Sequence, residues 1–580
     1  MKRPIGTRVA RWRCWFVGFL LCVVALGLAW RMVYLTVFDQ AFLRTQGDAR
    51  TLRVIDIPAY RGMITDRNGE PLAISTPVDA VWVNPKQFHP TDAQVQEIAA
   101  LLDLPAKDLA QRIQKNSKRD FLYLKRQVDP SISSQVKALG IPGLFLKREY
   151  RRFYPEGETV AQLVGFTNID DRGQEGMELA YDNWLQGAAG KKRVLKDRLG
   201  NTVADVDVIR EPTPGHNLVL SIDRRIQYIA YRALKEAVIQ NKATSGSVVV
   251  LDTRTGEVLA MANVPSFNPN NRGDYDPSTY RNRAMTDMFE PGSTLKTFMA
   301  ANAFASGRYV PDSIIDTSPG YMMVDGWRVD DEGHNNGKIN ITTIIQRSSN
   351  MGATRITLSL PPQSLPTLLR LAGFGQRETS DFPGESPGNL PSRPIWSSIS
   401  LATLSFGYGI GVTTLQLASA YQMFAANGVK YPISLLRLNA PPHGQLILAP
   451  SVAQQVLQVL QAVVEVGGTA PKAQIPGYHV AGKTGTARIL GPNGYQSNHH
   501  NALFVGVAPA SNPRLLVAIF IHDPQGSSYY GGPVAGPVFA KVMGGALRTL
   551  DISPDRFDNG PQKPTLKVQP LQGQAGVIND

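Results

Sequence analysis

The chain has almost no cysteine, and the motifs of several common chemistries are missing from it. Only Cys14 and Cys22 occur among 580 residues, so the rest of the protein has no disulfide and depends on the size of its core for stability. No HExxH, CxxC or Walker motif is present, and we therefore expect neither a metal nor a cofactor. A GxSxG elbow is also missing, and the eight histidines form no pattern around a candidate serine. No repeat with a period of 20 to 50 residues is found.

The sequence is basic overall, with a formal net charge of +13. Dense basic runs are few, and KREYRR and KKRVLKDR are the main ones outside the N-terminal tail. Scattered positive charge is typical of a solvated surface that favours anionic lipid or an anionic cell-wall polymer. Because the export signal described next keeps most of the chain out of the cytoplasm, we expect no nucleic-acid partner.

One long apolar run lies near the N-terminus. No charged residue occurs from Cys14 to Trp30, and after Arg31 the run resumes as MVYLTVF. Such a length crosses a bilayer core of about 30 Å at about 1.5 Å per helical residue. The positions before the run carry a set of basic residues and no acidic one: Lys2, Arg3, Arg8, Arg11 and Arg13. The positive-inside rule then predicts a cytoplasmic tail over 1–13, a transmembrane anchor over 14–37 and the remaining chain outside. A cleavable signal peptide is the alternative, but the run is long and bulky residues follow it.

The exported part divides into two modules. In the first, residues 53–84 alternate around Asn68-Gly69, which predicts a hairpin, and residues 91–139 have a helical, charged pattern. The second opens near Gly215 with a strand in NLVLSID and a helix over 224–239. Two further hairpins, GSVVVLDTRTGEVLAMAN and ALFVGVAPASNPRLLVAIFIHD, predict one antiparallel sheet with helices on both faces. We expect domains over 38–214 and 215–556, and a disordered tail over 557–580 because it has few apolar residues.

The stretch FEPGSTLKTF, residues 289–298, allows two interpretations of Ser293. A serine after Pro-Gly and before an apolar helical pattern is a good helix N-cap. The catalytic interpretation rests on Lys296, which the i, i+3 spacing puts on the same helix face, where its amine can reach the Ser293 hydroxyl. SxxK alone is weak, because a second copy runs from Ser134 to Lys137 without supporting residues.

Two downstream motifs strengthen the catalytic interpretation. RSSN supplies Ser348 and Asn350, and VAGKTGTA supplies Lys483, Thr484, Gly485 and Thr486. A decoy SxN occurs at Ser266, and the glycine-rich GYGIG at residues 407–411 is interpreted as a tight turn before a helix. The histidines His499 and His500 are expected in an exposed polar loop.

The chemistry of these residue types fits acyl transfer by an activated serine. A neutral Lys296 amine can accept the Ser293 proton, and a second cation at Lys483 would lower the pKa of Lys296. Ser348 can relay a proton to a leaving amine, and Asn350 can hold a peptide amide. Lys483 and Thr486 are donors for a terminal carboxylate, and Gly485 lets an extended substrate approach the backbone.

The order SxxK, SxN, KTG resembles the signature of class A β-lactamases and penicillin-binding proteins, with SSN where that pattern has SDN. A wider set of stretches is similar to the division-type class B penicillin-binding proteins, the septal peptidoglycan transpeptidases, and extends from the anchor to about residue 550: RGMITDRNGEPLA, FLYLKRQV, REYRRFYPEGETVAQLVGFTNIDDRGQEGMELAYDNWLQG, FEPGSTLKTF and VAGKTGTA.

The resemblance implies an α+β chain with a single transmembrane helix, an elongated mixed α/β pedestal of the dimerisation type, and a transpeptidase domain built on a five-stranded antiparallel sheet between helices. It implies that Ser293 is the acylated nucleophile, Lys296 its base and Ser348 a proton relay. Asn350, Lys483, Thr484, Gly485 and Thr486 would bind substrate, and the amides of Ser293 and Thr486 would form the oxyanion hole. In the pedestal, Arg61, Gly62, Arg152 and Glu175 match family positions, and we expect the arginines to be structural ion-pair partners.

The function implied is a D,D-transpeptidase of the inner membrane with its catalytic domain in the periplasm. It would cross-link stem peptides, be a target of β-lactams, and work with a glycan polymerase of the SEDS type and other division proteins, because no glycosyltransferase module precedes the pedestal. A β-lactamase or carboxypeptidase on the same scaffold is one alternative. A β-lactam sensor or an idle division scaffold is the other.

Overall fold

The computed structural model describes residues 11–197, 202–273, 276–378, 382–492 and 494–556. Two compact units make up the chain. The first contains residues 1–61, 77–151 and 186–216, and the second contains 62–76, 152–185 and 217–580. The expected disordered tail over 557–580 and most of the expected cytoplasmic tail over 1–13 lie outside the described residues. The domain limits at 38–214 and 215–556 stay predictions.

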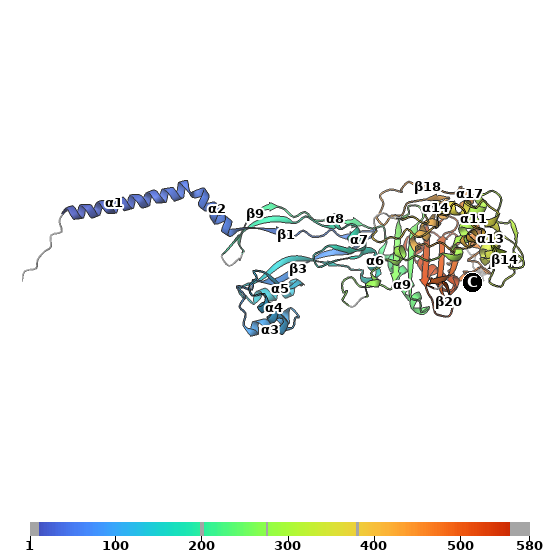
Figure 1. Cartoon of the computed structure of the whole chain (residues 1–580), viewed down its shortest axis with the longest axis horizontal. Helices are drawn as coiled ribbons and strands as arrows, with labels where there is room; N and C mark the ends of the chain where they lie inside the picture. The colour runs from blue at the N-terminus through green and yellow to red at the C-terminus, as the bar shows by residue number, and fades with distance from the viewer. Residues whose placement is uncertain (1–10, 198–201, 274–275, 379–381, 493, 557–580) are drawn as a thin grey trace, which may run out of the picture. The chain divides into compact units, whose positions relative to one another are not determined.

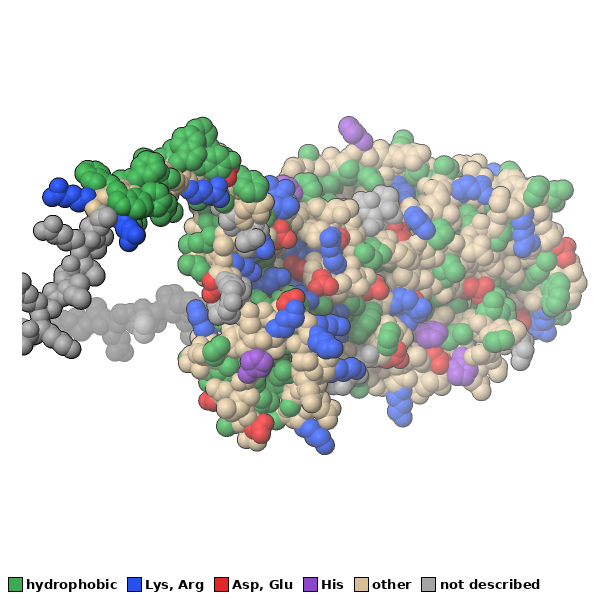
Figure 2. All heavy atoms as spheres, turned by 60° about the vertical axis from the view of Figure 1, so that its left-hand side comes forward, with side chains coloured by type: hydrophobic (Ala, Val, Ile, Leu, Met, Phe, Trp, Pro, Cys, Tyr) green, Lys and Arg blue, Asp and Glu red, His purple; other side chains and the backbone are tan. Residues whose placement is uncertain are grey.

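The apolar run forms a long helix, as predicted. Helix α1, Arg11–Val33, continues into a π-helical turn, Tyr34–Phe38, and helix α2 follows over Gln40–Thr51. No side chain of α1 is buried, and its surface is almost entirely hydrophobic (Figure 2). The 28 residues Arg11–Phe38 are long and apolar enough to cross a membrane. The predicted anchor over 14–37 falls within this segment.

The first unit holds two small sheet regions. Strands β1 (Leu52–Ile57), β8 (Gly190–Lys196) and β9 (Thr202–Arg210) form an antiparallel sheet in the order β1-β8-β9. Strand β4 (Leu122–Val128) pairs antiparallel with the later residues of β3 (Pro71–Val83), and β5 (Leu144–Phe153) also pairs with β3. Three helices share a hydrophobic core with β3, β4 and β5: α3 (Asp92–Leu101), α4 (Ala106–Lys115) and α5 (Pro130–Ala138).

Two sequence predictions for the first module were partly wrong. The segment 91–139 contains strand β4 between its helices, because LYLKRQV completes a sheet edge that a local helical pattern does not reveal. The hairpin at Asn68-Gly69 exists, but it joins only β2 (Ile64–Thr65) to β3, and residues 52–57 pair with β8 instead. Long-range pairing thus replaced the local pairing that the alternation suggested.

The second unit begins with short elements around a buried ion pair. Arg152 donates to Glu178 at 2.7 Å, and both side chains are almost fully buried, in agreement with the structural role expected for this arginine. The short elements are α6 (Ala161–Val164), β6 (Phe166–Thr167), β7 (Gly173–Glu175), α7 (Gly176–Ala180), α8 (Asp182–Leu185) and β10 (Leu218–Val219).

The second unit is organised around the predicted five-stranded antiparallel sheet, of which β20 is labelled in Figure 1. The strand order is β12-β11-β21-β20-β19. Their bounds are β11 Ser245–Asp252, β12 Val258–Val264, β19 Ala481–Gly491, β20 Gly494–Ala508 and β21 Leu515–His522. Both predicted hairpins, β11/β12 and β20/β21, are confirmed. His499 and His500 lie in strand β20 rather than in a loop, because the pairing of β20 with β19 extends past them.

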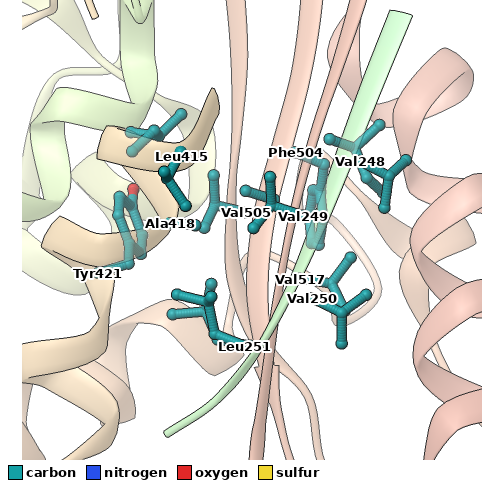
Figure 3. Packing of buried hydrophobic residues seen from close by; sticks show 14 of the residues in the cluster. Val248, Val249, Val250, Leu251, Leu415, Ala418, Tyr421, Phe504, Val505 and Val517 are labelled. Carbon is teal, nitrogen blue, oxygen red and sulfur yellow. The ribbon is translucent and has the colours of Figure 1, made fainter. Parts of the chain in front are cut away.

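Helices cover both faces of this sheet. Helix α9 (Arg224–Gln240) and helix α18 (Gly531–Thr549) contact each other and the strands, and helix α16 (Thr414–Ala425) contacts β11 and β21. In Figure 3, Leu251 faces Leu415, Ala418 and Tyr421 of α16, whereas Val248 and Val250 point to the opposite side. Because both faces of the sheet are covered, the sequence of β11 is a continuous apolar run rather than an alternation of apolar and polar residues.

The remaining helices and strands lie between β12 and β19 in the chain. They are α10 (Arg283–Thr286), α11 (Lys296–Ala305), β13 (Ile314–Asp316), β14 (Tyr321–Val324), β15 (Trp327–Asp330), β16 (Lys338–Asn340), α12 (Ile341–Arg347), α13 (Asn350–Leu358), α14 (Ser364–Leu371), α15 (Ser398–Ser405), β17 (Val429–Lys430), β18 (Gln445–Leu446) and α17 (Pro450–Gln461).

Candidate active site

Ser293 does not cap a helix in this structure. It lies within a 3₁₀ turn, Gly292–Leu295, that runs directly into α11, and neither element has a side-chain cap. The Ser293 Oγ instead lies 3.0 Å from the Nζ of Lys296, one turn further on. The N-cap interpretation of Ser293 is therefore wrong, and the i, i+3 contact predicted from the SxxK spacing is present.

The Lys296 amine lies among four oxygen atoms. Besides Ser293 Oγ, these are the Ser348 carbonyl oxygen at 2.5 Å, Asn350 Oδ1 at 2.7 Å and Ser348 Oγ at 3.1 Å. A neutral amine has two N–H donors and one lone pair, so the carbonyl oxygen and Asn350 can accept its two protons. Its lone pair is then free to accept the Ser293 proton.

A break between two helices brings Ser348 and Asn350 to this amine. Helix α12 ends at Arg347, its C-cap Ser348 has a φ of 61° in the left-handed region, and α13 begins at Asn350. Ser349 caps α13 by accepting the amide of Gly352 at 3.0 Å. Adjacent helix ends therefore present a carbonyl, a hydroxyl and an amide oxygen to one point.

Asp331 holds this break in place, although it belongs to none of the predicted motifs. Its side chain is buried, its Oδ1 accepts the Met351 amide at 2.8 Å and its Oδ2 accepts the Ser349 hydroxyl at 2.6 Å. A carboxylate at a helix N-terminus is also favoured by the helix dipole. Asp331 is therefore a positioning residue for Ser348 and Asn350, recognisable only once α13 is folded against it.

Lys483 approaches the same group from strand β19. Its Nζ lies 3.1 Å from Ser348 Oγ and 3.3 Å from both oxygen atoms of Thr484, and its side chain is fully buried. Ser348 Oγ thus contacts both amines. Thr484 Oγ1 also contacts Thr469 Oγ1 at 2.9 Å, and Thr486 Oγ1 accepts the Gly531 amide at 3.1 Å.

Both lysines have depressed pKa values. Burial lowers the pKa of Lys296 to about 7, while the carboxylates of Asp331 and Glu332 act in the opposite direction. Burial and the charge of Lys296 lower the pKa of Lys483 well below its usual range. The main cause for Lys296 is therefore desolvation rather than the second cation that the sequence suggested. Because the two amines share Ser348, we expect at most one of them to be charged near pH 7.

Two glycines, which have no side chain, let the turn Gly292–Leu295 pack closely against its neighbours. We call this segment the nucleophile turn, after the role predicted for Ser293. A Cβ at Gly485 would lie 2.8 Å from the carbonyl oxygen of Pro291, and one at Gly407 would lie 2.0 Å from that of Gly292. Gly485 thus makes room for the turn that carries Ser293, and the substrate approach expected at this glycine stays a prediction. The GYGIG segment is a turn before α16, as predicted, and it also packs against the nucleophile turn.

The site opens into a cleft of about 570 Å³. Its wall includes, among others, Ser293, Ser348, Asn350, Thr484, Thr486, Asp331, Glu332, His334, Asn336, Arg347, Thr469, Tyr530 and Gly531. Lys296 and Lys483 lie behind this wall, where water is excluded from them. Within the described ranges, no three His, Cys, Asp or Glu side chains gather as a metal site requires.

The two decoy motifs have structural partners elsewhere. Ser134 Oγ donates to the Ser131 carbonyl within α5, and Ser266 Oγ donates to the Glu158 carbonyl. Neither serine lines the cleft. The predicted site residues come together from three separate segments of the chain, while the identical short patterns at Ser134 and Ser266 do not join them.

Two family models match the chain. The model of the penicillin binding protein transpeptidase domain matches residues 246–544, and the model of the penicillin-binding protein dimerisation domain matches residues 56–220.

Curated relatives match over nearly the whole length. The chain is 43% identical over 542 residues to the probable peptidoglycan D,D-transpeptidase PbpC of Pseudomonas aeruginosa, covering 93% of this chain and 96% of that protein. It is 41% identical over 554 residues to the peptidoglycan D,D-transpeptidase FtsI of Escherichia coli, covering 94% of each.

Solved structures agree in fold. The transpeptidase domain of penicillin-binding protein 3 from Burkholderia pseudomallei is 38% identical with a TM-score of 0.54, and covers 58% of this chain and 98% of that one. Penicillin-binding protein 3 from Mycobacterium tuberculosis, complexed with aztreonam, is 27% identical with a TM-score of 0.67, and covers 87% of this chain and 98% of that one.

Proposed function

Because this chain belongs to the class B penicillin-binding proteins, which join a dimerisation domain to a transpeptidase domain, we propose that it cross-links peptidoglycan stem peptides through an acyl-enzyme on Ser293. The observation that carries the proposal is the 3.0 Å contact between Ser293 Oγ and the buried Lys296 amine at the wall of the cleft. The FtsI relatives support peptidoglycan D,D-transpeptidase activity in cell division.

Acylation begins with Lys296 as general base. The neutral amine takes the Ser293 proton while Oγ attacks the penultimate D-alanyl carbonyl of a stem peptide. The backbone amides of Ser293 and Thr486 stabilise the oxyanion that develops. Ser348, which contacts both amines, passes a proton to the departing nitrogen as the C–N bond breaks and D-alanine leaves.

Substrate binding uses the strand and the second motif. Asn350 holds a peptide amide through its side chain, and Lys483 with Thr486 binds the terminal carboxylate of the donor peptide. Thr484 supports the Lys483 amine through its two oxygens, and Gly485 keeps the strand close to the nucleophile turn. The acyl-enzyme persists until an amine of a second stem peptide displaces the serine.

The N-terminal helix supports a proposal for the cell location. We propose that Arg11–Phe38 is a single-pass anchor of the inner membrane and that the catalytic domain is periplasmic, as the basic residues before the helix indicate. A membrane glycan polymerase of the SEDS type and other division proteins are the expected partners. β-Lactams are expected to acylate Ser293 as mimics of the donor peptide, since a relative of the family was solved with aztreonam.

The experiment is labelling of the chain with a fluorescent penicillin, followed by intact-mass measurement over hours. Wild type should gain one stable adduct, and Ser293→Ala should gain none. Ser134→Ala is the matched control, because it removes the serine of the unsupported SxxK copy, and it should label like wild type. An adduct that is lost within minutes would indicate a β-lactamase, and a folded wild type without label would favour an idle scaffold.

A further inference from the structure

One part of the cleft wall has no task in the donor reaction described above. The loop that follows β15 lines the cleft with Asp331, Glu332, His334 and Asn336. Asp331 is committed to the start of α13, and Asn336 donates to Asp331 at 3.0 Å while accepting from Arg347 at 3.2 Å. The loop is therefore tied to the helix break at both of its ends, and Glu332 lies between the two ties.

Glu332 is the exposed acid of this loop. Its backbone has a φ of 53°, a left-handed conformation that a glutamate adopts at a cost, while its amide donates to Asp330 Oδ1 at 3.0 Å. Within the described ranges, its carboxylate has no hydrogen-bond or ion-pair partner. Arg347, a cation on the same wall, donates to Asn336 and forms no ion pair with Glu332.

The charge of Glu332 reaches the reaction centre. Burial lowers the pKa of Lys296, and Asp331 followed by Glu332 opposes this effect. The Asp331 carboxylate already has three donors at 3.0 Å or less, whereas that of Glu332 is free to bind a ligand. An open carboxylate on the side of the cleft that carries Ser348 is suited to a cation that must come close to Ser348.

The acceptor of transpeptidation arrives as such a cation, because a primary amine in water near neutral pH is mostly an ammonium ion. We propose that Glu332 forms the acceptor subsite and binds the primary ammonium of the incoming stem peptide beside Ser348. The inference rests on the proposed function and adds to it the residue that favours an amine over water as the second substrate.

In the acceptor reaction, the nitrogen of the incoming ammonium loses two protons. The ammonium bound at Glu332 loses one proton to water, and the free amine attacks the carbonyl of the Ser293 ester. The C–N bond forms as the C–Oγ bond breaks, and the second nitrogen proton passes through Ser348 and Lys296 to Ser293 Oγ. The products are the cross-linked amide, the free enzyme and one proton released to solvent.

The test measures how the acyl-enzyme partitions between acceptors. The full chain in detergent is acylated with an N-acyl-D-alanyl thioester, and D-alaninamide is added as a cationic amine that lacks a carboxylate. The ratio of amide product to hydrolysis product is measured by mass spectrometry, and methanol serves as a neutral acceptor. The ratio is taken after acylation, so it does not depend on the acylation rate.

We expect Glu332→Gln to lower the amide-to-hydrolysis ratio by about fivefold, the size of one partly screened charge interaction. Glu332→Asp should retain most of the ratio, and the ratio to methanol should not change with either variant. Added salt should lower the amide ratio in wild type and have little effect in Glu332→Gln. Glu97→Gln removes an exposed carboxylate of α3, which does not line the cleft, and serves as the control.

An amide ratio in Glu332→Gln equal to that of Glu97→Gln would overturn the proposal, and so would an equal fall in the methanol ratio, which would indicate a general distortion of the site. If Ser293 takes up neither thioester nor penicillin, the proposed function itself fails and this subsite fails with it. If Glu332→Gln is acylated normally and its amide-to-hydrolysis ratio is unchanged, only the role proposed for Glu332 is refuted and the proposed function stands.

Discussion

At the scale of the residue, the protonation state of Lys296 controls the chemistry. A buried amine with a pKa of about 7 is neutral in a large fraction of molecules at neutral pH, whereas an exposed lysine is almost entirely charged. Because the charged form has no lone pair for the Ser293 proton, acylation by the proposed mechanism requires the neutral form.

The rate of acylation by a β-lactam should therefore rise with pH through a midpoint near 7 and level off above it. Below the midpoint the rate should fall about tenfold per pH unit, as the neutral fraction does. Stopped-flow acylation between pH 5 and 9 measures this. Lys296→Arg, which stays charged, should lose about 10²- to 10⁴-fold at every pH. A flat profile in wild type would contradict Lys296 as the base.

Asp331 offers a second test at this scale. Asp331→Asn removes a carboxylate that raises the pKa of Lys296, so the midpoint of the acylation profile should shift to lower pH. Asn also cannot accept both the Met351 amide and the Ser349 hydroxyl, which should cost about 1–3 kcal/mol of stability. Denaturant unfolding and the pH profile report the two effects. Asp312→Asn, at an exposed aspartate, should alter neither, and an unshifted midpoint in Asp331→Asn would refute the electrostatic role.

At the scale of the element, the site depends on how closely strand β19 lies against the turn before α11. The turn carries Ser293 and the strand carries Lys483, and their separation is set by the hydrogen atom that Gly485 has in place of a side chain. The Pro291 carbonyl oxygen is a backbone atom that cannot rotate away from an added Cβ, and the Cγ2 of Thr294 and the Cβ of Leu503 also lie close to it.

Gly485→Ala should accordingly push the turn from the strand and slow acylation by about tenfold or more, because small displacements of reacting groups are costly. The Cβ would meet the Pro291 carbonyl oxygen at 2.8 Å, closer than side-chain carbons come to other atoms. Gly273→Ala is the control, since no atom lies within 4 Å of the added Cβ. Penicillin labelling rates with circular dichroism spectra compare the two. Equal rates in both variants would show that the close packing is not needed.

At the scale of the whole molecule, the apolar helix is suited to a lipid bilayer, whereas the folded units are suited to water. Helix α1 exposes large hydrophobic side chains along its length, among them Trp15, Phe19 and Leu26. Burial of such a surface in a bilayer is strongly favourable, and the chain after it has its own buried cores.

Removal of residues 1–38 should therefore release the protein from membranes without loss of penicillin labelling. Full-length chain and the shortened chain are compared by flotation with liposomes, and labelling is measured on both. We expect the full chain to float and the shortened chain to remain in solution. A shortened chain that still floats would assign membrane binding to another surface.

Local sequence was sufficient for several features because their causes are local. The long uncharged run requires a nonpolar solvent, apolar β-rich runs joined by polar turns form hairpins, and the i, i+3 spacing of Ser293 and Lys296 places both on one helix face. The two hairpins, with helical segments between them in the chain, likewise predicted a sheet with helices on both faces. The motif order also selected the two serines that line one cleft and the two lysines that lie buried behind its wall.

Only the tertiary structure decided the features that depend on residues distant in sequence. Strand β4 and the partner of β1 follow from long-range pairing, and the clamp formed by Asp331 exists only when β15 lies against α13. The low pKa of Lys296 comes from burial, which a sequence does not state, and the contact of Gly485 with the nucleophile turn is a packing role that the motif alone did not reveal. Sequence thus determined which groups can react, and packing determined their distance, hydration and charge, because these quantities arise from atoms that meet only in the folded chain.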